Sequence, residues 1–206
     1  PMRVSIDFLE EVGNSAERVL KVTEILHVED DDGPDLAFLR VAEPANGGAA
    51  PIALDGGPAS ARIRKQVAVI GYPARDSRIP EPDLMMQIFG DIFDKKRLAP
   101  GQVKTDTTDS ELQHDCSTLG GNSGSVVLDL DSGSAVGLHF AGRFLEANFA
   151  APSAIVAERL HAVKRGEAKG TTISIPKPQP RSGPARSDLQ RPDASPAGST
   201  TRLFCT

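Results

Sequence analysis

A serine flanked by glycines is the clearest chemical feature of this sequence. Residues 120–125 read Gly-Gly-Asn-Ser-Gly-Ser, with Ser123 in fourth place. A serine hydroxyl attacks a carbonyl carbon if a base takes its proton and if donors receive the charge that develops on oxygen. A tight turn would expose Ser123 Oγ and aim the amides of Gly121 and Ser123 at one spot, as an oxyanion hole. Gly121 suits that turn because glycine adopts conformations closed to residues with a Cβ atom.

The same six residues also suit a polar hairpin loop, which is a common use of Gly, Asn and Ser. The residues that follow favour the chemical interpretation. An apolar run at 126–128 comes directly after the loop, then a turn at 131–134, then a second apolar run at 135–142 that contains His139. Two apolar runs joined by a short Gly-containing turn indicate a hairpin that would hold the loop in place.

These segments closely resemble the trypsin-like peptidases of the chymotrypsin fold, and within them the bacterial glutamyl-endopeptidase-like (V8-like) branch. The resemblance spans residues 3–165 and is most specific at 114–142. The matching segments are residues 35–41, 67–73, 117–125, 137–142 and 148–152.

The resemblance implies a serine endopeptidase that acts on a polypeptide substrate through an acyl-enzyme on Ser123. The amides of Gly121 and Ser123 would form the oxyanion hole, and Asp35 would orient the catalytic histidine. From the residues alone, the favoured interpretation of Asp35 is an aspartate that caps a turn after Asp-Asp-Asp-Gly-Pro at 30–34.

His139 and Thr118 fall where glutamate-specific members of the resembled branch hold the substrate carboxylate. A hydroxyl and an imidazole can both donate a hydrogen bond to a carboxylate. The alternative is that His139, on an apolar strand, is a satisfied core residue. Cleavage after acidic residues is therefore one of two readings of this pair.

The catalytic histidine of the resembled family is not found where the family has it, tens of residues before the aspartate. Only 34 residues precede Asp35, and none has a suitable context. His27 is too close to Asp35, His114 leads into the serine loop, and His161 lies on a predicted helix. We therefore expect the base to come from an upstream segment or a partner chain, and this chain alone to be nearly inactive.

The composition is that of a globular protein without a cofactor motif. Hydrophobic residues make up 39% and charged residues 25%, and the net charge is −5. Residues 164–206 are basic and the rest is acidic, which argues against a nucleic-acid groove. No membrane span or signal peptide is expected in these residues. His114 and Cys116 lack a second pair of metal ligands, so no metal is expected, and the two cysteines favour a cytoplasmic over a secreted location only slightly.

Short β-type runs separated by turn residues predict an all-β fold. One helix is expected at 154–163 with Ser153 as its cap. Glycine- and proline-containing turns are expected at 44–48 and 56–58. The predicted β-type runs are residues 4–8, 18–28, 36–41, 66–71, 84–93, 126–130 and 135–140.

The predicted architecture is a chymotrypsin-like double β-barrel whose first barrel is incomplete at its N-terminus. It is followed by one C-terminal helix and a tail that is disordered from about residue 177. The expected divisions are 1–55 for the rest of the first barrel, 56–151 for the second barrel, 152–165 for the helix and 166–206 for the linker and tail.

Two other functions remain open from the sequence. The same double barrel could be a catalytically inactive module that binds a peptide or partner, with Ser123 as a relic. The amides of the glycine loop could instead hold a phosphate. A histidine in an upstream segment would favour the enzyme over both.

Overall fold

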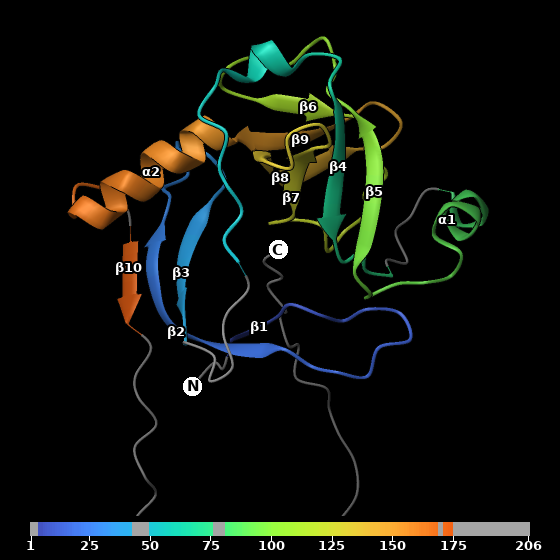
Figure 1. Cartoon of the computed structure of the whole chain (residues 1–206), viewed down its shortest axis with the longest axis horizontal. Coiled ribbons are helices and arrows are strands. Elements are labelled where there is room, and N and C mark those ends of the chain that lie inside the picture. The colour runs from blue at the N-terminus through green and yellow to red at the C-terminus, as the bar shows by residue number, and fades with distance from the viewer. Residues whose placement is uncertain (1–3, 43–49, 76–80, 169–170, 175–206) are drawn as a thin grey trace, which may run out of the picture.

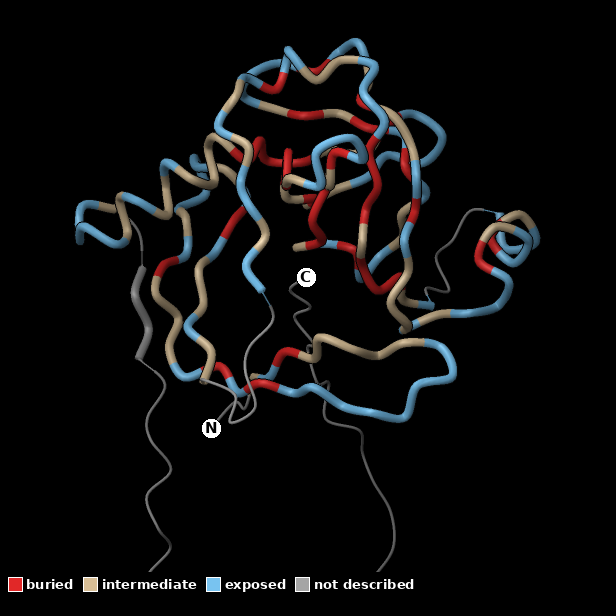
Figure 2. The backbone as a smooth tube through the Cα atoms, in the orientation of Figure 1, coloured by how far each residue is buried: buried red, intermediate tan, exposed pale blue. Residues whose placement is uncertain are grey.

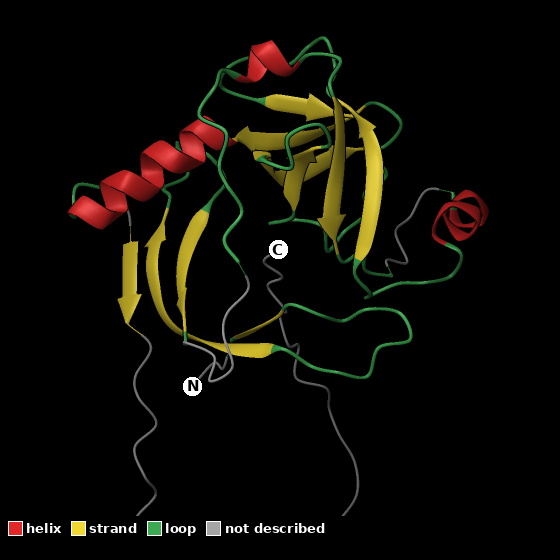
Figure 3. Cartoon of the chain, viewed as in Figure 1, coloured by secondary structure: helices red, strands yellow, loops and turns green. Residues whose placement is uncertain are grey.

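The computed structural model describes residues 4–42, 50–75, 81–168 and 171–174, which form two antiparallel β-sheets with helices at their margins (Figure 1). Strands dominate the regular structure, as Figure 3 shows. This confirms the all-β fold class. Six of the seven predicted β-type runs correspond to observed strands, at 4–8, 18–28, 36–41, 66–71, 126–130 and 135–140.

The first sheet is built around the long strand β2 (Val19–Val28). β2 pairs antiparallel with β1 (Ser5–Asp7), β3 (Ala37–Val41) and β10 (Thr171–Ser174). β10 lies within the stretch that we expected to be linker, so the chain after the C-terminal helix returns to the first sheet. The rest of the predicted tail, residues 175–206, and the predicted turn at 44–48 lie outside the described residues.

The second sheet has six strands and curls into a barrel. Its outer strands meet where Asp115 N donates to Gln102 O at 3.1 Å and Lys104 N donates to Gln113 O at 2.8 Å. In spatial order the strands are β5 (Arg97–Gln102), β4 (Gln66–Gly71), β7 (Val126–Asp129), β8 (Ala135–Arg143), β9 (Ala147–Pro152) and β6 (Leu112–His114).

The hydrophobic core lies inside this second barrel, where the buried backbone concentrates in Figure 2. Its members come mostly from alternate positions of the strands, as expected when one sheet face points inward. The fully enclosed positions include Val67, Val69, Leu112, Val127 and Ala150. A packed barrel of this kind gives the loops at its ends a rigid base.

Residues 84–93 form no strand, so that sequence prediction is wrong. A helix, α1 (Pro82–Phe89), covers most of this stretch. Proline suits the first turn of a helix, and the buried Met85 and Phe89 are four residues apart, on one helical face. Gly90 ends the helix in the left-handed region with φ 60°, and its N–H donates to Met86 O at 2.8 Å.

The predicted C-terminal helix is present as α2 (Ser153–Arg165) and lies against β8 and β9. Ser153 does not cap it, because the N-cap position is Pro152 and no side chain caps the helix. The buried Ser153 hydroxyl instead donates to Asp55 O at 2.6 Å, which ties the helix start to the segment before β4. In the part of the chain that the structure describes, no helix is long and apolar enough to cross a membrane.

Replacing Ser153 by alanine is expected to lower the free energy of unfolding by about 1–2 kcal/mol, because the partly buried carbonyl of Asp55 loses its donor. Urea unfolding measures this difference. Ser15→Ala, at an exposed serine with no hydrogen bond among the described residues, is the control and should change stability by less than about 0.5 kcal/mol. Equal effects of the two variants would contradict the structural role of Ser153.

Candidate active site

Ser123 is exposed in the loop that joins β6 to β7, and hydrogen bonds within the loop hold its shape. The side chain and backbone N–H of the buried Asn122 both donate to Leu119 O, at 3.1 and 3.2 Å. Ser125 N donates to Asn122 O at 3.0 Å. The Ser123 hydroxyl itself donates to Phe140 O at 3.1 Å, so the serine already contacts β8.

Gly121 takes the backbone conformation that the sequence analysis expected of it. Its φ is 92°, and a Cβ atom there would lie 2.6 Å from Tyr72 O and 2.9 Å from Ala74 N. No other residue fits this position without moving the backbone. Within the described residues, neither Gly121 N nor Ser123 N donates a hydrogen bond. Neither amide is therefore engaged by the described part of the chain.

Asp35 is exposed in the turn that precedes β3. Across the residues that the structure describes, Asp35 forms no ion pair and no imidazole bonds Ser123 Oγ. His27 is buried and contacts Glu29 Oε1 at 3.1 Å, and that same oxygen contacts Arg159 Nε of α2 at 3.1 Å. The structure thus assigns His27 to a contact between the first sheet and α2 and does not join Asp35 to Ser123.

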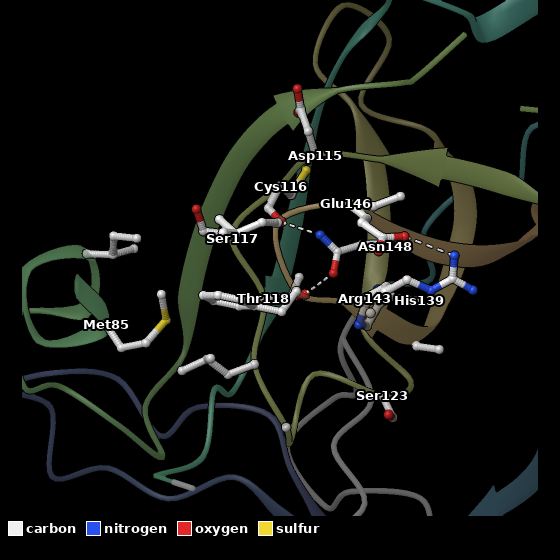
Figure 4. A pocket seen from close by; sticks show the side chains of 18 of the residues that line it. Met85, Asp115, Cys116, Ser117, Thr118, Ser123, His139, Arg143, Glu146 and Asn148 are labelled. Atoms are coloured by element: carbon white, nitrogen blue, oxygen red, sulfur yellow. Dashed lines mark hydrogen bonds and ion pairs between the residues drawn. The ribbon is translucent and has the colours of Figure 1, made fainter. Parts of the chain in front are cut away.

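A pocket of about 640 Å³ opens beside Ser123 (Figure 4). The predicted specificity residues Thr118 and His139 both line it, which brings three of the five sequence-predicted positions together. The β8–β9 turn and helix α1 add apolar walls through Phe144, Leu145, Met85, Ile88 and Phe89. The space can therefore accept a side chain that has both apolar and polar atoms.

His139 does not stand alone in this pocket, because it contacts a second buried histidine. His139 Nδ1 lies 3.2 Å from His114 Nε2, and the two rings meet edge to face. Burial lowers the pKa of His139 to about 4. Burial, and then the neighbouring His139, lower the pKa of His114 to about 3. Both rings are neutral at pH 7.

Asn148 also lines the pocket, and sequence reasoning missed it as a site residue. Thr118 Oγ1 donates to Asn148 Oδ1 at 2.5 Å, and Asn148 Nδ2 donates to Cys116 O at 2.7 Å (Figure 4). A Cβ atom on Gly142 would lie 2.5 Å from Asn148 Oδ1, so the glycine leaves room for this amide. Asn148 fixes the hydroxyl of Thr118 at the wall of the pocket.

Cys116 is buried, and its burial raises the pKa of the thiol to about 12, so it stays protonated. Among the described side chains, no three His, Cys, Asp or Glu residues gather as a metal site would require.

The family model of the trypsin-like peptidase domain matches residues 6–138. This chain belongs to that family.

Known proteins similar to the chain agree with this family. A probable serine protease from Lysobacter enzymogenes is 34% identical over 111 residues, covering 47% of this chain and 29% of that protein. Two solved structures each have a TM-score of 0.50. One is the inactive form of a serine-to-alanine mutant of Rv3671c from Mycobacterium tuberculosis, which is 17% identical; the match covers 74% of this chain and 69% of the Rv3671c chain. The other is the serine endoprotease from Yersinia pestis, which is 18% identical; the match covers 72% of this chain and 46% of the Yersinia chain.

These structural likenesses confirm the chymotrypsin-like fold. The chain spans less than a third of the Lysobacter relative that it matches.

The buried histidine pair is expected to make the fold sensitive to acid. The pKa of each ring is lowered in the folded state. Below about pH 6.5 the unfolded chain therefore binds more protons than the folded chain, and the free energy of unfolding decreases as the pH is lowered. Each histidine contributes up to about 1.4 kcal/mol per pH unit, down to about pH 4 for His139 and pH 3 for His114. Urea unfolding between pH 7 and pH 4 measures the slope.

His114→Leu should flatten this slope, whereas His161→Leu, at an exposed histidine of α2, should leave it unchanged. If wild-type and His114→Leu proteins lost stability in parallel, the histidine pair would not be the source of the acid sensitivity.

Proposed function

We propose that this chain is the nucleophile-bearing part of a serine endopeptidase, with Ser123 as the nucleophile. The observation that carries the proposal is the serine loop: an exposed Ser123 next to a glycine at φ 92°, with two backbone amides that bond nothing else among the described residues. Such preorganised donors stabilise the oxyanion of acyl transfer, and loss of one typically costs about 2.7–4 kcal/mol.

In the proposed reaction, a histidine takes the proton of Ser123 Oγ as the oxygen attacks the carbonyl carbon of a peptide bond. The amides of Gly121 and Ser123 receive the negative charge on the carbonyl oxygen. The intermediate then collapses, the histidine returns the proton to the leaving amine, and water later hydrolyses the acyl-enzyme on Ser123.

The base in this proposal is a histidine outside the four that these 206 residues contain. His114 and His139 contact each other, His27 contacts Glu29, and His161 lies on α2. Asp35 would orient the added imidazole and stabilise its protonated form. A second candidate is an inactive peptide-binding module. It is supported by the hydrogen bond from Ser123 Oγ to Phe140 O, since among the described residues no imidazole bonds Ser123.

Fluorophosphonate labelling separates these two candidates. We expect a longer polypeptide of this protein, containing the upstream segment, to be labelled on Ser123 at least a hundredfold faster than this chain. Without its base, the serine keeps only the oxyanion donors. Ser123→Ala is the matched control and should abolish labelling. A longer polypeptide that folds and yet carries no label on Ser123 would overturn the peptidase proposal.

We further propose that the pocket selects an acidic side chain before the cleaved bond, as in the V8-like branch. Of the two possible tautomers of the histidine pair, one has His114 Nε2–H donating to His139 Nδ1. The other would leave a proton on His114 Nδ1, a buried atom without a hydrogen-bond partner. Buried donors without partners are rarer than buried acceptors without them.

The favoured tautomer places a proton on His139 Nε2, the ring nitrogen that has no partner among the described residues. This would give a substrate carboxylate a donor within the pocket, beside the Thr118 hydroxyl, whose own proton is donated to Asn148 Oδ1. A neutral donor suits the site because the imidazole need not be charged in order to hydrogen-bond a carboxylate.

A substrate series tests the acidic preference on the full-length enzyme. His139→Leu should lower kcat/KM for peptides with Glu before the cleaved bond by about tenfold to a hundredfold, since a hydrogen bond to a charged group is worth about 1.5–3 kcal/mol. Peptides with Gln there should lose much less. His161→Leu serves as the control. A wild-type enzyme that cleaved Glu and Gln peptides equally would rule out this specificity while leaving the peptidase proposal intact.

A further inference from the structure

Three polar side chains meet where the first sheet contacts α2, and the proposed reaction uses none of them. Glu29 Oε1 lies 3.1 Å from His27 Nε2 of β2 and 3.1 Å from Arg159 Nε of α2. The side chains of His27 and Glu29 are only 3% and 8% exposed. A carboxylate buried to this extent costs free energy unless it is paired, so these three side chains, the Glu29 cluster, act as one unit.

The Glu29 cluster forms the base of the turn that carries Asp35. Glu29 N donates to Leu36 O at 3.2 Å, which closes the turn next to Asp35. A Cβ atom on Gly33 would lie 2.6 Å from Glu29 Oε2, so the second carboxylate oxygen lies against the middle of the turn. Asp35 is exposed and, within the described residues, has no ion pair of its own. Its position therefore follows from the backbone of a turn that packs on Glu29.

Helix α2 connects this turn to the barrel that carries Ser123 (Figure 1). The helix packs on β8 and β9, and β8 supplies Phe140 O, which accepts the hydrogen bond of Ser123 Oγ. Arg159 lies on the same helix and reaches the first sheet at Glu29. The contact between Arg159 and Glu29 thus joins the turn of Asp35 to an element that is packed against the serine-bearing barrel.

We propose that Glu29 and Arg159 are positioning residues, which hold the turn of Asp35 at a fixed place relative to Ser123. This inference rests on the proposed peptidase function, in which Asp35 orients the imidazole that activates Ser123. Asp35 and Ser123 belong to different sheets, so the distance between them depends on contacts that join the sheets. A misplacement of about 1 Å that arises far from the chemistry lowers a rate by up to about a hundredfold.

A double-mutant cycle on the full-length protein tests this role, with the rate of fluorophosphonate labelling of Ser123 as the readout. The reagent depends on the base and the oxyanion donors and needs no substrate side chain in the pocket. Arg159 is 41% exposed, so glutamine replaces it without disturbing the core. Arg159→Gln should slow labelling about tenfold in the wild-type background but less than about twofold in an Asp35→Ala background, where no carboxylate is left to position. Glu29→Gln is the second variant and should behave alike.

Arg165→Gln is the matched control on the same helix. Arg165 Nη2 lies 2.7 Å from Glu167 Oε2, just beyond the end of α2, and this variant should label at the wild-type rate. Arg159→Lys keeps the positive charge and should label faster than Arg159→Gln.

Two results would overturn the positioning role alone: equal slowing by Arg159→Gln in the wild-type and Asp35→Ala backgrounds, or an unchanged rate in the wild-type background. The first would show a general structural effect, and the second would show that the contact does not affect Ser123. A folded full-length wild type that carries no label on Ser123 would overturn the peptidase proposal, and the positioning role with it.

Discussion

The close packing of the serine loop on the backbone of β4 is the constraint on which the site depends. A Cβ atom on Gly71, the last residue of β4, would lie 2.0 Å from Ser125 Oγ and 2.4 Å from Asn122 Oδ1. The loop therefore rests directly on the strand. Gly121 repeats this close approach one residue beyond the end of β4, beside Tyr72 O. These two glycines bring the loop onto the rigid barrel, and the orientation of Ser123 follows from this contact.

The barrel also carries a polar pair inside its own core, and buried polar groups of this kind need hydrogen-bond partners. His114 and His139 are both almost fully buried, and each supplies the other's hydrogen-bond partner. Keeping both rings neutral avoids placing a charge in an apolar interior. The same arrangement leaves one ring nitrogen of His139 for the pocket, so core packing and substrate recognition would share these residues.

Much of the fold could be predicted from the sequence because most strands follow alternating or continuous apolar patterns, and six of the seven predicted runs are strands. The failures have local physical causes. Residues 84–93 are apolar enough for a strand, but Pro82 and Gly90 supply helix boundaries that a count of apolar residues ignores. β5 was not predicted because it contains Pro100 and Gly101, which are depleted in strands. Proline is tolerated there because β5 lies at one end of the strand order.

The site was predictable where a role depends on local sequence and not where it depends on pairing in space. The left-handed Gly121 follows from its own motif. The hydrogen bond between His114 and His139 joins residues 25 positions apart. The sequence offered one indication of it: His114 is two residues after Leu112, so that in a strand both side chains point to the same, buried face. The Asn148 contact with Thr118 crosses 30 residues and has no local signal.

A crystal structure of the protein with a peptidyl boronic acid ending in a boronic analogue of glutamate would test the central claim most directly. We predict a covalent bond from boron to Ser123 Oγ, one boronate oxygen within hydrogen-bond distance of the Gly121 and Ser123 amides, and the side-chain carboxylate near His139 and Thr118. Boron bound to another residue, or bound to Ser123 with its oxygens turned away from both amides, would contradict the account.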